Sequence, residues 1–414
     1  MNEDRRIRIA ITQGDTNGVG LELILKAFED PTMFELCTPV VYGSPKVASY
    51  YRKVLGSDVS YTVINDAHDA RDGQLNLLAV IQDEVKIDMG QPTVESAEAA
   101  VKALAKAVAD VRDGLMDGLV AGPVNERGFD FKDLHFDSQT ELVAQLLERH
   151  ARKMAAAQGN AGADVAAEPG TATAAVNALR LLVGDECRVA TLTDGGSLRN
   201  AADMLTTESV ASKAAQLLQV LRRDLDVNNP RVAVLAWNAR GGRDDRPGYE
   251  ELDIIAPAVE QLSQDGRQVF GPYSAERLMI PDRLRHYDAV LAMHRDQVVA
   301  PFHLMEQGDG VVLSAGLPIV MAEPGHGACF DIAGKNIADV SAMRAAIYMV
   351  TDVVRQRSRY DEPMGNPLPK LYHERRDESE KVRFRSNDRR EPDAAAAVGQ
   401  ADTQAEPEIV ADES

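Results

Sequence analysis

The sequence predicts an α/β protein with two lobes around a cleft, and three observations support this prediction. Short apolar runs such as Ile7–Thr12, Leu119–Ala121 and Asp288–Met293 have the composition of buried strands, and they lead directly into polar, Gly-rich segments. Amphipathic helices separate such runs, and Thr93–Asp113 is the clearest of them. The chain has 414 residues and is 44% hydrophobic, so it can bury a core large enough for two lobes.

Composition and charge exclude several classes of protein. The net charge of -20 argues against sequence-independent binding of nucleic acid or of an anionic membrane, because either would need a basic face. The three cysteines are odd in number and far apart, which indicates neither a disulfide framework nor a zinc cluster. The N-terminus lacks an apolar signal region, and no apolar run approaches the roughly 18 residues of a membrane span. We therefore expect a cytoplasmic protein with no nucleic-acid or membrane partner.

The first predicted strand, Ile7–Thr12, leads through the turn Gly14–Gly20 into a helix over Leu21–Phe28. A strand, a Gly-rich turn and a helix in this order present helix N-terminal amides to a phosphate or to the edge of a cofactor. The turn contains neither a G-x-G-x-x-G fingerprint nor a P-loop. Asp15 and Asn17 are its candidate cleft residues, and a purely structural turn is the alternative interpretation.

The stretch from His286 to Gly334 is the predicted centre of the site, because three apolar runs in it end in polar, Gly-rich residues. These transitions are Asp288–Met293 into His294–Gln297, Val311–Ser314 into Gly316, and Pro318–Ala322 into the Gly325–Gly327 turn with His326. Open α/β sheets bind ligands at the carboxyl ends of their strands, so we expect one cleft to collect all three ends. Asn125 and Asn238 follow two further predicted strands and are candidates for the same cleft.

Two segments lie outside the predicted core. Residues 155–177 are rich in Ala, Gly and small polar residues without periodicity, which predicts a flexible loop inserted between a helix and the strand Arg188–Thr193. Residues 361–414 combine much charge with few aromatic residues, and we expect them to form a disordered charged tail.

Several motifs in one order resemble a known family. They are ITQGDTNGVGLELILKAF, LVAGPVNE, HFDSQTE, RVAVLAWNARGG, AM-x-x-DQ, GLP, HG and D-x-AG, and they extend from Ile7 to Arg357. Together they resemble the NAD-dependent 4-hydroxythreonine-4-phosphate dehydrogenases of pyridoxal phosphate synthesis. The resemblance implies an isocitrate/isopropylmalate dehydrogenase-like core over residues 1–360, with lobe A at 1–127 and 301–358 and lobe B at 128–300. It also implies NAD as cofactor and a homodimer whose site takes residues from both subunits.

The same resemblance places the family's three metal-binding histidines on Gly195, Arg240 and Arg295 of this chain. Glycine has no ligating side chain, and arginine does not coordinate a divalent ion. His294 precedes the third position by one residue, but a shift of one residue at a strand end turns the side chain to the opposite face. We therefore predict that a divalent metal is absent.

Substrate-binding positions of the resembled family are changed as well. The family's His and Thr correspond to Gln139 and Thr140, and its phosphate-binding Lys, Asn and Arg correspond to His303, Val312 and Met321. The segment around Gln139 has an alternative interpretation, because Ser138 and Glu141 alone form the pattern of a helix capping box.

These replacements suggest a rebuilt, metal-free site. Arg240 and Arg295, with Asp296 beside them, form a candidate site for a small anion. The alternative is that the arginines pair with Asp194, Asp296 or Glu126 and close an inactive cleft.

Three functional hypotheses follow from the replaced residues. One is a divergent oxidoreductase acting on a phosphorylated or acidic hydroxy compound through replacement residues. Another is a catalytically inactive paralogue, or pseudoenzyme, that binds a ligand or has a regulatory role. The third is the family activity maintained by other metal ligands. The loss of so many chemical positions favours a divergent or inactive paralogue.

Overall fold

A computed structural model of the chain describes residues 5–82, 85–125, 130–131, 134–136, 138–157, 178–195, 197–239, 248–307 and 310–365. These residues belong to one compact unit, Met1–Asn366. No helix in the described ranges is long and apolar enough to cross a membrane. The division into two lobes stays a prediction.

The described residues form a 12-stranded sheet with the order β11-β10-β12-β9-β8-β13-β14-β5-β1-β2-β4-β3. Its strands are β1 (Arg8–Thr12), β2 (Thr38–Gly43), β3 (Tyr61–Ile64), β4 (Leu75–Ala79), β5 (Gly118–Val120), β8 (Leu179–Val183), β9 (Arg188–Thr193), β10 (Val232–Leu235), β11 (Val269–Tyr273), β12 (Ala289–His294), β13 (Val311–Ala315) and β14 (Met321–Pro324). β6 (Asp130–Phe131) and β7 (Leu134–His135) form a separate antiparallel pair. Most neighbours in the large sheet are parallel, but β13 is antiparallel to both β14 and β8, and β8 is antiparallel to β9.

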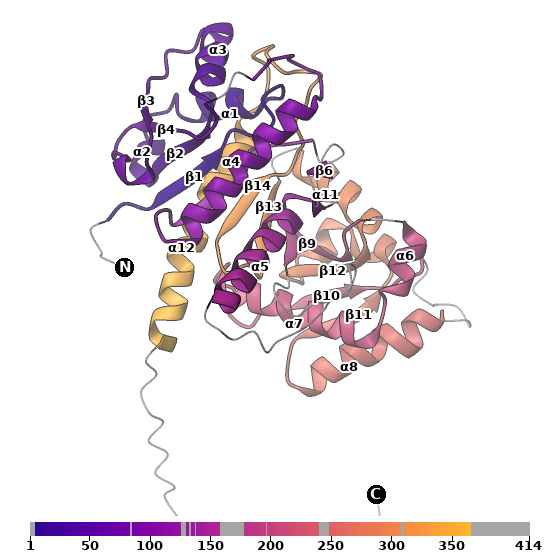
Figure 1. Ribbon diagram of the computed structural model, residues 1–414. Coiled ribbons are helices and arrows are strands. Elements are labelled where there is room, and N and C mark those ends of the chain that lie inside the picture. The colour runs from indigo at the N-terminus through magenta and orange to yellow at the C-terminus, as the bar shows by residue number, and fades with distance from the viewer. Residues whose placement is uncertain are drawn as a thin grey trace, which may run out of the picture. The chain divides into compact units, whose positions relative to one another are not determined.

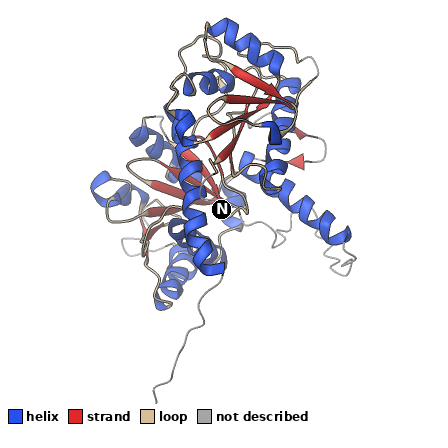
Figure 2. Ribbon diagram, turned by 90° about the vertical axis from the view of Figure 1, so that its left-hand side faces the viewer, coloured by secondary structure: helices blue, strands red, loops and turns tan. Residues whose placement is uncertain are grey.

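Helices cover both faces of this sheet (Figures 1 and 2). They are α1 (Gly20–Ala27), α2 (Met33–Leu36), α3 (Pro45–Leu55), α4 (Val94–Arg112), α5 (Gln139–Ala157), α6 (Leu198–Asp203), α7 (Thr207–Arg223), α8 (Ala256–Gln264), α9 (Ala275–Leu278), α10 (Pro281–Leu284), α11 (Val299–Glu306) and α12 (Ser341–Gly365), with short helical turns η1 (Ala67–Asp69), η3 (Glu250–Ile255) and η4 (Arg295–Gln297). The predicted α/β class is therefore confirmed.

Strand β1 shows how the sequence forms two cores. Side chains alternate between the two faces of a strand. Ile9 and Ile11 accordingly belong to a core that includes residues of α1, α7 and α12, whereas Ala10 belongs to a second core with residues of α4 and α5. Helix α5 thus begins on the sheet face to which Ala10 points, and this is the face that carries the candidate site.

The N-terminal Gly-rich turn is held by buried internal hydrogen bonds. The Asp15 carboxylate accepts from the backbone N–H of Asn17 at 2.9 Å and from the Ser96 hydroxyl at 3.1 Å. The Asn17 amide donates to the Gln91 carbonyl at 2.9 Å and to the Thr93 hydroxyl at 3.2 Å. Asp15 and Asn17 are both buried, so these contacts favour the structural interpretation of the turn, in which it fixes the start of α4.

The N-terminal cap of α4 is the one predicted from the sequence. The C-terminal end of the folded core lies further along the chain than predicted. Thr93 caps α4 and forms a capping box with Ser96. Helix α12 continues to Gly365, so residues 361–365 are helical and the expectation of disorder is wrong for this part of the tail. The rest of the tail lies outside the described residues, as does the predicted loop beyond residue 157, whereas residues 155–157 belong to α5.

Candidate functional site

A cavity of about 330 Å³ gathers several of the predicted strand ends. Its described lining consists of Val124, Asn125, Gln139, Arg180, Arg295, Glu323, Pro324, Gly325, His326, Gly327, Ala328, Cys329 and Phe330. Asn125 follows β5, Arg295 follows β12 and Glu323 lies at the end of β14. The cavity therefore combines residues that are far apart in the sequence and that belong to both predicted lobes.

Arg180 reaches this cavity from the beginning of β8. It pairs in register with Ser314 of β13, so the two side chains lie on the same face of the sheet. The Ser314 hydroxyl lies 2.7 Å from the hydroxyl of Thr140 in the first turn of α5, which covers this face. The Arg180 side chain is only 11% exposed, and its guanidinium lies 3.7 Å from Glu323 and 3.8 Å from Asp194.

Asp194 connects Arg180 to Arg295. Its carboxylate lies 3.6 Å from the Arg295 guanidinium and 3.8 Å from that of Arg180, and it also accepts a hydrogen bond from the Thr191 hydroxyl at 3.3 Å. One carboxylate therefore faces two guanidiniums. The predicted internal pairing of Arg295 with Asp194 is present, and the second arginine shown in this pairing is Arg180.

Glu323 is the second buried carboxylate of the site. It accepts a 2.6 Å hydrogen bond from the side-chain amide of Gln139, which also donates to the Gly122 carbonyl at 3.3 Å. Gln139 therefore lines the cavity, and its role as a substrate position stays a prediction. Thr140 does not line it, because its hydroxyl is buried against Ser314.

The three predicted phosphate positions do not form a site. Val312 and Met321 are 1% and 0% exposed and belong to hydrophobic cores, so neither lines the cavity. Their side chains pack into apolar layers, which does not favour a ligand contact. His303 on α11 is exposed as a whole residue, but partial desolvation of its ring, together with the nearby Arg295 and Arg180, lowers its pKa. The lowered pKa favours its neutral form over the cation.

Three positions were predicted from the resemblance to match the family's metal ligands, and their assignment stays a prediction. Gly195 is exposed and has no donor, Arg295 is a cation that faces Asp194, and Arg240 lies outside the described residues. His294 does not line the cavity and packs edge-on against Trp237 with ring centroids 5.4 Å apart, as the one-residue offset predicts. Within the described ranges, no three His, Cys, Asp or Glu side chains are grouped closely enough to hold a metal.

The remaining candidates divide into lining residues and residues elsewhere. Asn125 and His326 line the cavity, and His326 Nδ1 lies 3.6 Å from the Cys329 sulfur. Burial raises the pKa of the Cys329 thiol, which donates to the Gly327 carbonyl at 3.2 Å. Asp296 is exposed and Asn238 bonds to Glu250 and Glu251, so neither contributes to this cavity.

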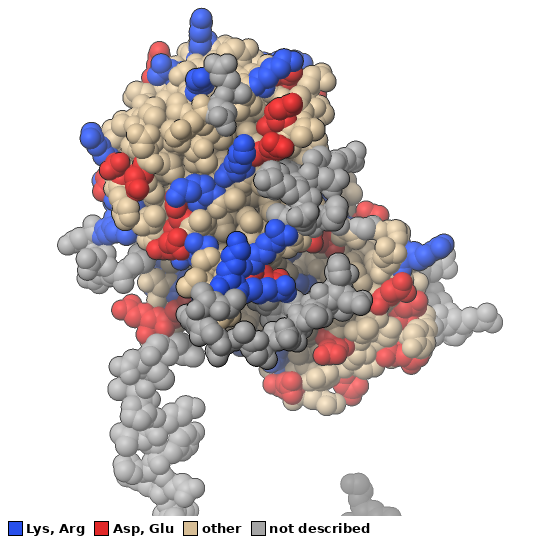
Figure 3. Space-filling model, viewed as in Figure 1, with Lys and Arg blue, Asp and Glu red and all other residues tan. Residues whose placement is uncertain are grey.

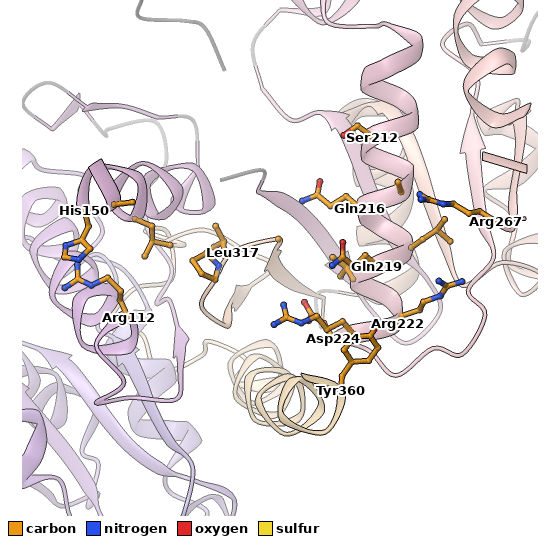
Figure 4. A pocket seen from close by; sticks show the side chains of 18 residues that line it. Arg112, His150, Ser212, Gln216, Gln219, Arg222, Asp224, Arg267, Leu317 and Tyr360 are labelled. Carbon is orange, nitrogen blue, oxygen red and sulfur yellow. The ribbon is translucent and has the colours of Figure 1, made fainter. Parts of the chain in front are cut away.

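The expectation that all three strand ends share one cleft is wrong for β13. Because β13 is antiparallel to β14, their carboxyl ends point in opposite directions along the sheet. Gly316 after β13 instead lines a larger cavity of about 1050 Å³, together with side chains from α5 and α7 (Figure 4). Lys and Arg side chains gather over α5 on the neighbouring surface (Figure 3), and Arg112 and His150 are among the cavity's lining residues.

Two important residues of the smaller cavity were missed in the sequence. Arg180 and Glu323 each stand as a single charged residue in an apolar strand, Leu179–Val183 and Met321–Pro324. An isolated charge in a buried strand is costly unless it is paired. This was the available signal, but only the strand order shows that the two charges face each other.

The fold and the cavity define an α/β protein with a candidate small-ligand site on one face of its sheet, beside the N-terminus of a helix. Comparison with known proteins is more specific. The chain belongs to the family described as "Pyridoxal phosphate biosynthetic protein PdxA", whose model matches residues 35–350.

Named relatives agree with this assignment. The chain is 38% identical over 382 residues to 4-hydroxythreonine-4-phosphate dehydrogenase of Bacteroides thetaiotaomicron, a match that covers 92% of the chain and 98% of the relative. It is 30% identical to the enzyme of the same name from Caulobacter vibrioides, over 84% of the chain and 98% of the relative.

Solved structures show the same fold. A 4-hydroxythreonine-4-phosphate dehydrogenase from Burkholderia phymatum matches with a TM-score of 0.63 and 25% identity, over 84% of the chain and 99% of that protein. The structure of the same-named enzyme from Klebsiella pneumoniae has a TM-score of 0.68 at 23% identity, over 86% of the chain and 99% of that protein, and supports the fold alone.

Proposed function

We propose that this chain is a divergent PdxA-family protein that binds a small anionic hydroxy compound without the family's divalent metal, and that it is inactive or nearly so on 4-phosphohydroxythreonine. The observation that supports this most strongly is the Arg295 guanidinium, which faces Asp194 at 3.6 Å and which the resemblance assigns to a family metal position. A guanidinium is a permanent cation with directed donors, so this position is suited to an anion rather than to a metal ion.

The changed phosphate positions support the same proposal. A phosphate group is held by charge-assisted hydrogen bonds from Lys and Arg, each of which contributes about 1.5–3 kcal/mol. Met321 and Val312 offer only apolar side chains and are buried in the core. The family substrate would therefore lose most of its phosphate contacts in this chain.

A second candidate function is an active oxidoreductase on a phosphorylated or acidic hydroxy compound. The 38% identity to a named dehydrogenase over nearly its whole length favours this candidate. In it, NAD would accept the hydride, and residues of this chain would orient the alcohol and take up its proton. The described cavity of about 330 Å³ is at the lower end of the usual size of ligand pockets, so it suits a small hydroxy acid and not a whole dinucleotide.

A turnover experiment separates the two candidates. Purified protein is incubated with NAD or NADP and 4-phosphohydroxythreonine, or with a panel of small hydroxy acids and their phosphates, and reduced cofactor is followed by absorbance. Each reaction is run with added zinc or magnesium and with a chelator. We expect background rates with the family substrate in both arms. A normal, chelator-sensitive rate with that substrate would refute the proposal, and chelator-resistant turnover of another hydroxy acid would favour the second candidate.

The assembly is a separate part of the proposal. By family membership we expect a homodimer in which both subunits contribute to each site. Light scattering at several protein concentrations measures the mass directly, and a monomer throughout would contradict this expectation.

A further inference from the structure

We propose that Asp194 is an internal competitor for the anion site between Arg180 and Arg295, and that the ligand which displaces it does so with a carboxylate group. This inference rests on the proposed function, because it specifies the ligand class of the same cavity.

The geometry of the ion pairs suggests an exchangeable contact. Asp194 lies 3.6 Å from Arg295 and 3.8 Å from Arg180, whereas a charge-assisted hydrogen bond between such groups is about 2.7–2.9 Å long. Asp194 also follows the last residue of β9, and its side chain is 33% exposed. The carboxylate thus holds the two guanidiniums by charge without close hydrogen bonds, and a ligand carboxylate could approach both more closely.

The charge balance of the cavity favours a carboxylate over a phosphate. Among the described residues, two guanidiniums face two carboxylates, Asp194 and Glu323, and the lowered pKa of the nearby His303 favours its neutral form. A monoanionic carboxylate that takes the place of Asp194 adds one negative charge to these four described groups, whereas a phosphate adds up to two. Guanidinium groups also bind planar carboxylates through two parallel N–H donors.

Substitution of Asp194 by Asn tests the competition directly. The change keeps the side-chain shape and removes the charge that competes for the arginines. We expect D194N to bind D-glycerate with a Kd about tenfold lower than wild type, a change that corresponds to about 1.4 kcal/mol. An increase in affinity cannot result from misfolding, so this variant stays informative even where the arginine variants are unstable.

The matched control is D296N. Asp296 is exposed and follows the neighbouring strand, and among the described residues no ion pair joins it to Arg180 or Arg295, so the same loss of one negative charge should leave the affinity nearly unchanged. R295Q should weaken D-glycerate binding in either background. Titration calorimetry of the full-length chain with D-glycerate and with inorganic phosphate, at low and at physiological salt, supplies every comparison.

The titrations test the role of Asp194 and the ligand class separately. A lower Kd in D194N but not in D296N, with tighter binding of D-glycerate than of phosphate, supports it. Equal effects of D194N and D296N, or none, would overturn the role of Asp194, and tighter binding of phosphate to wild type would overturn the ligand class. Because these titrations need neither cofactor nor turnover, they can fail while the turnover test still supports the proposed function, and the reverse is equally possible.

Discussion

Removing one partner of the buried ion pair between Arg357 and Asp224 should cost more stability than removing one partner of an exposed pair. The guanidinium of Arg357 in α12 donates two 2.8 Å hydrogen bonds to the carboxylate of Asp224, which follows α7. It also donates to the carbonyls of Leu317 and Ile319, at 3.2 and 3.1 Å, in the connection between β13 and β14. The two side chains are 8% and 2% exposed, so water cannot replace these bonds without local opening.

We expect R357M to lower the free energy of unfolding by about 3–5 kcal/mol, because it leaves the Asp224 carboxylate buried without a cation. Unfolding entropy is about 2.1 cal/mol/K per residue, so for the 366 residues of the compact unit this loss corresponds to a Tm decrease of about 4–6 °C. Urea unfolding followed by circular dichroism measures the free energy, and calorimetry measures the Tm.

Two further variants make this experiment specific. R355M, on the same helix, removes a cation whose 3.6 Å pair with Asp352 is 44% and 75% exposed, and it should cost less than about 1 kcal/mol. The double variant R357M/D224L removes both buried charges and should recover much of the loss. A loss in R357M no larger than in R355M, or a double variant as unstable as the sum of its single changes, would refute the reasoning.

Three more predictions concern the site and its supporting turn. Metal analysis of untagged protein should find no stoichiometric zinc, magnesium or cobalt, and a tightly held ion would contradict the assignment of Gly195 and Arg295 as non-ligands. Restoring histidines in G195H/R240H/R295H should not raise turnover of 4-phosphohydroxythreonine above background, because the phosphate contacts stay absent; recovery of a normal rate would show that the metal site alone was missing. Burial raises the pKa of Asp15, so its contribution to stability is fully present below its unfolded pKa of about 4 and is lost as the pH rises through the folded value. The stability of D15N relative to wild type should therefore increase from pH 4 to pH 7 in urea titrations, and a difference that does not change with pH would contradict this assignment.

The sequence by itself determined the α/β class, the family and the positions of most elements. Strands such as Arg188–Thr193 and the capped start of α4 at Thr93 were recognisable because side-chain periodicity and helix capping depend on residues that are close in the chain. The assignment of Gly195 and Arg295 to metal positions of the family also came from motif order alone, and it stays a prediction.

Only the tertiary structure decided which of these residues meet. Arg180 and Glu323 are 143 positions apart, and they face each other because β8, β13 and β14 are neighbours in the sheet. The direction of β13 could not be predicted either, because its sequence resembles that of the neighbouring strands. Its antiparallel pairing with β14 places Gly316 at a different cavity. Val312 and Met321 were assigned to a ligand site by alignment with the family, and their apolar side chains instead pack into the cores. The physical reason is the same in each case, since strand pairing and the facing of side chains depend on long-range contacts that local sequence does not specify.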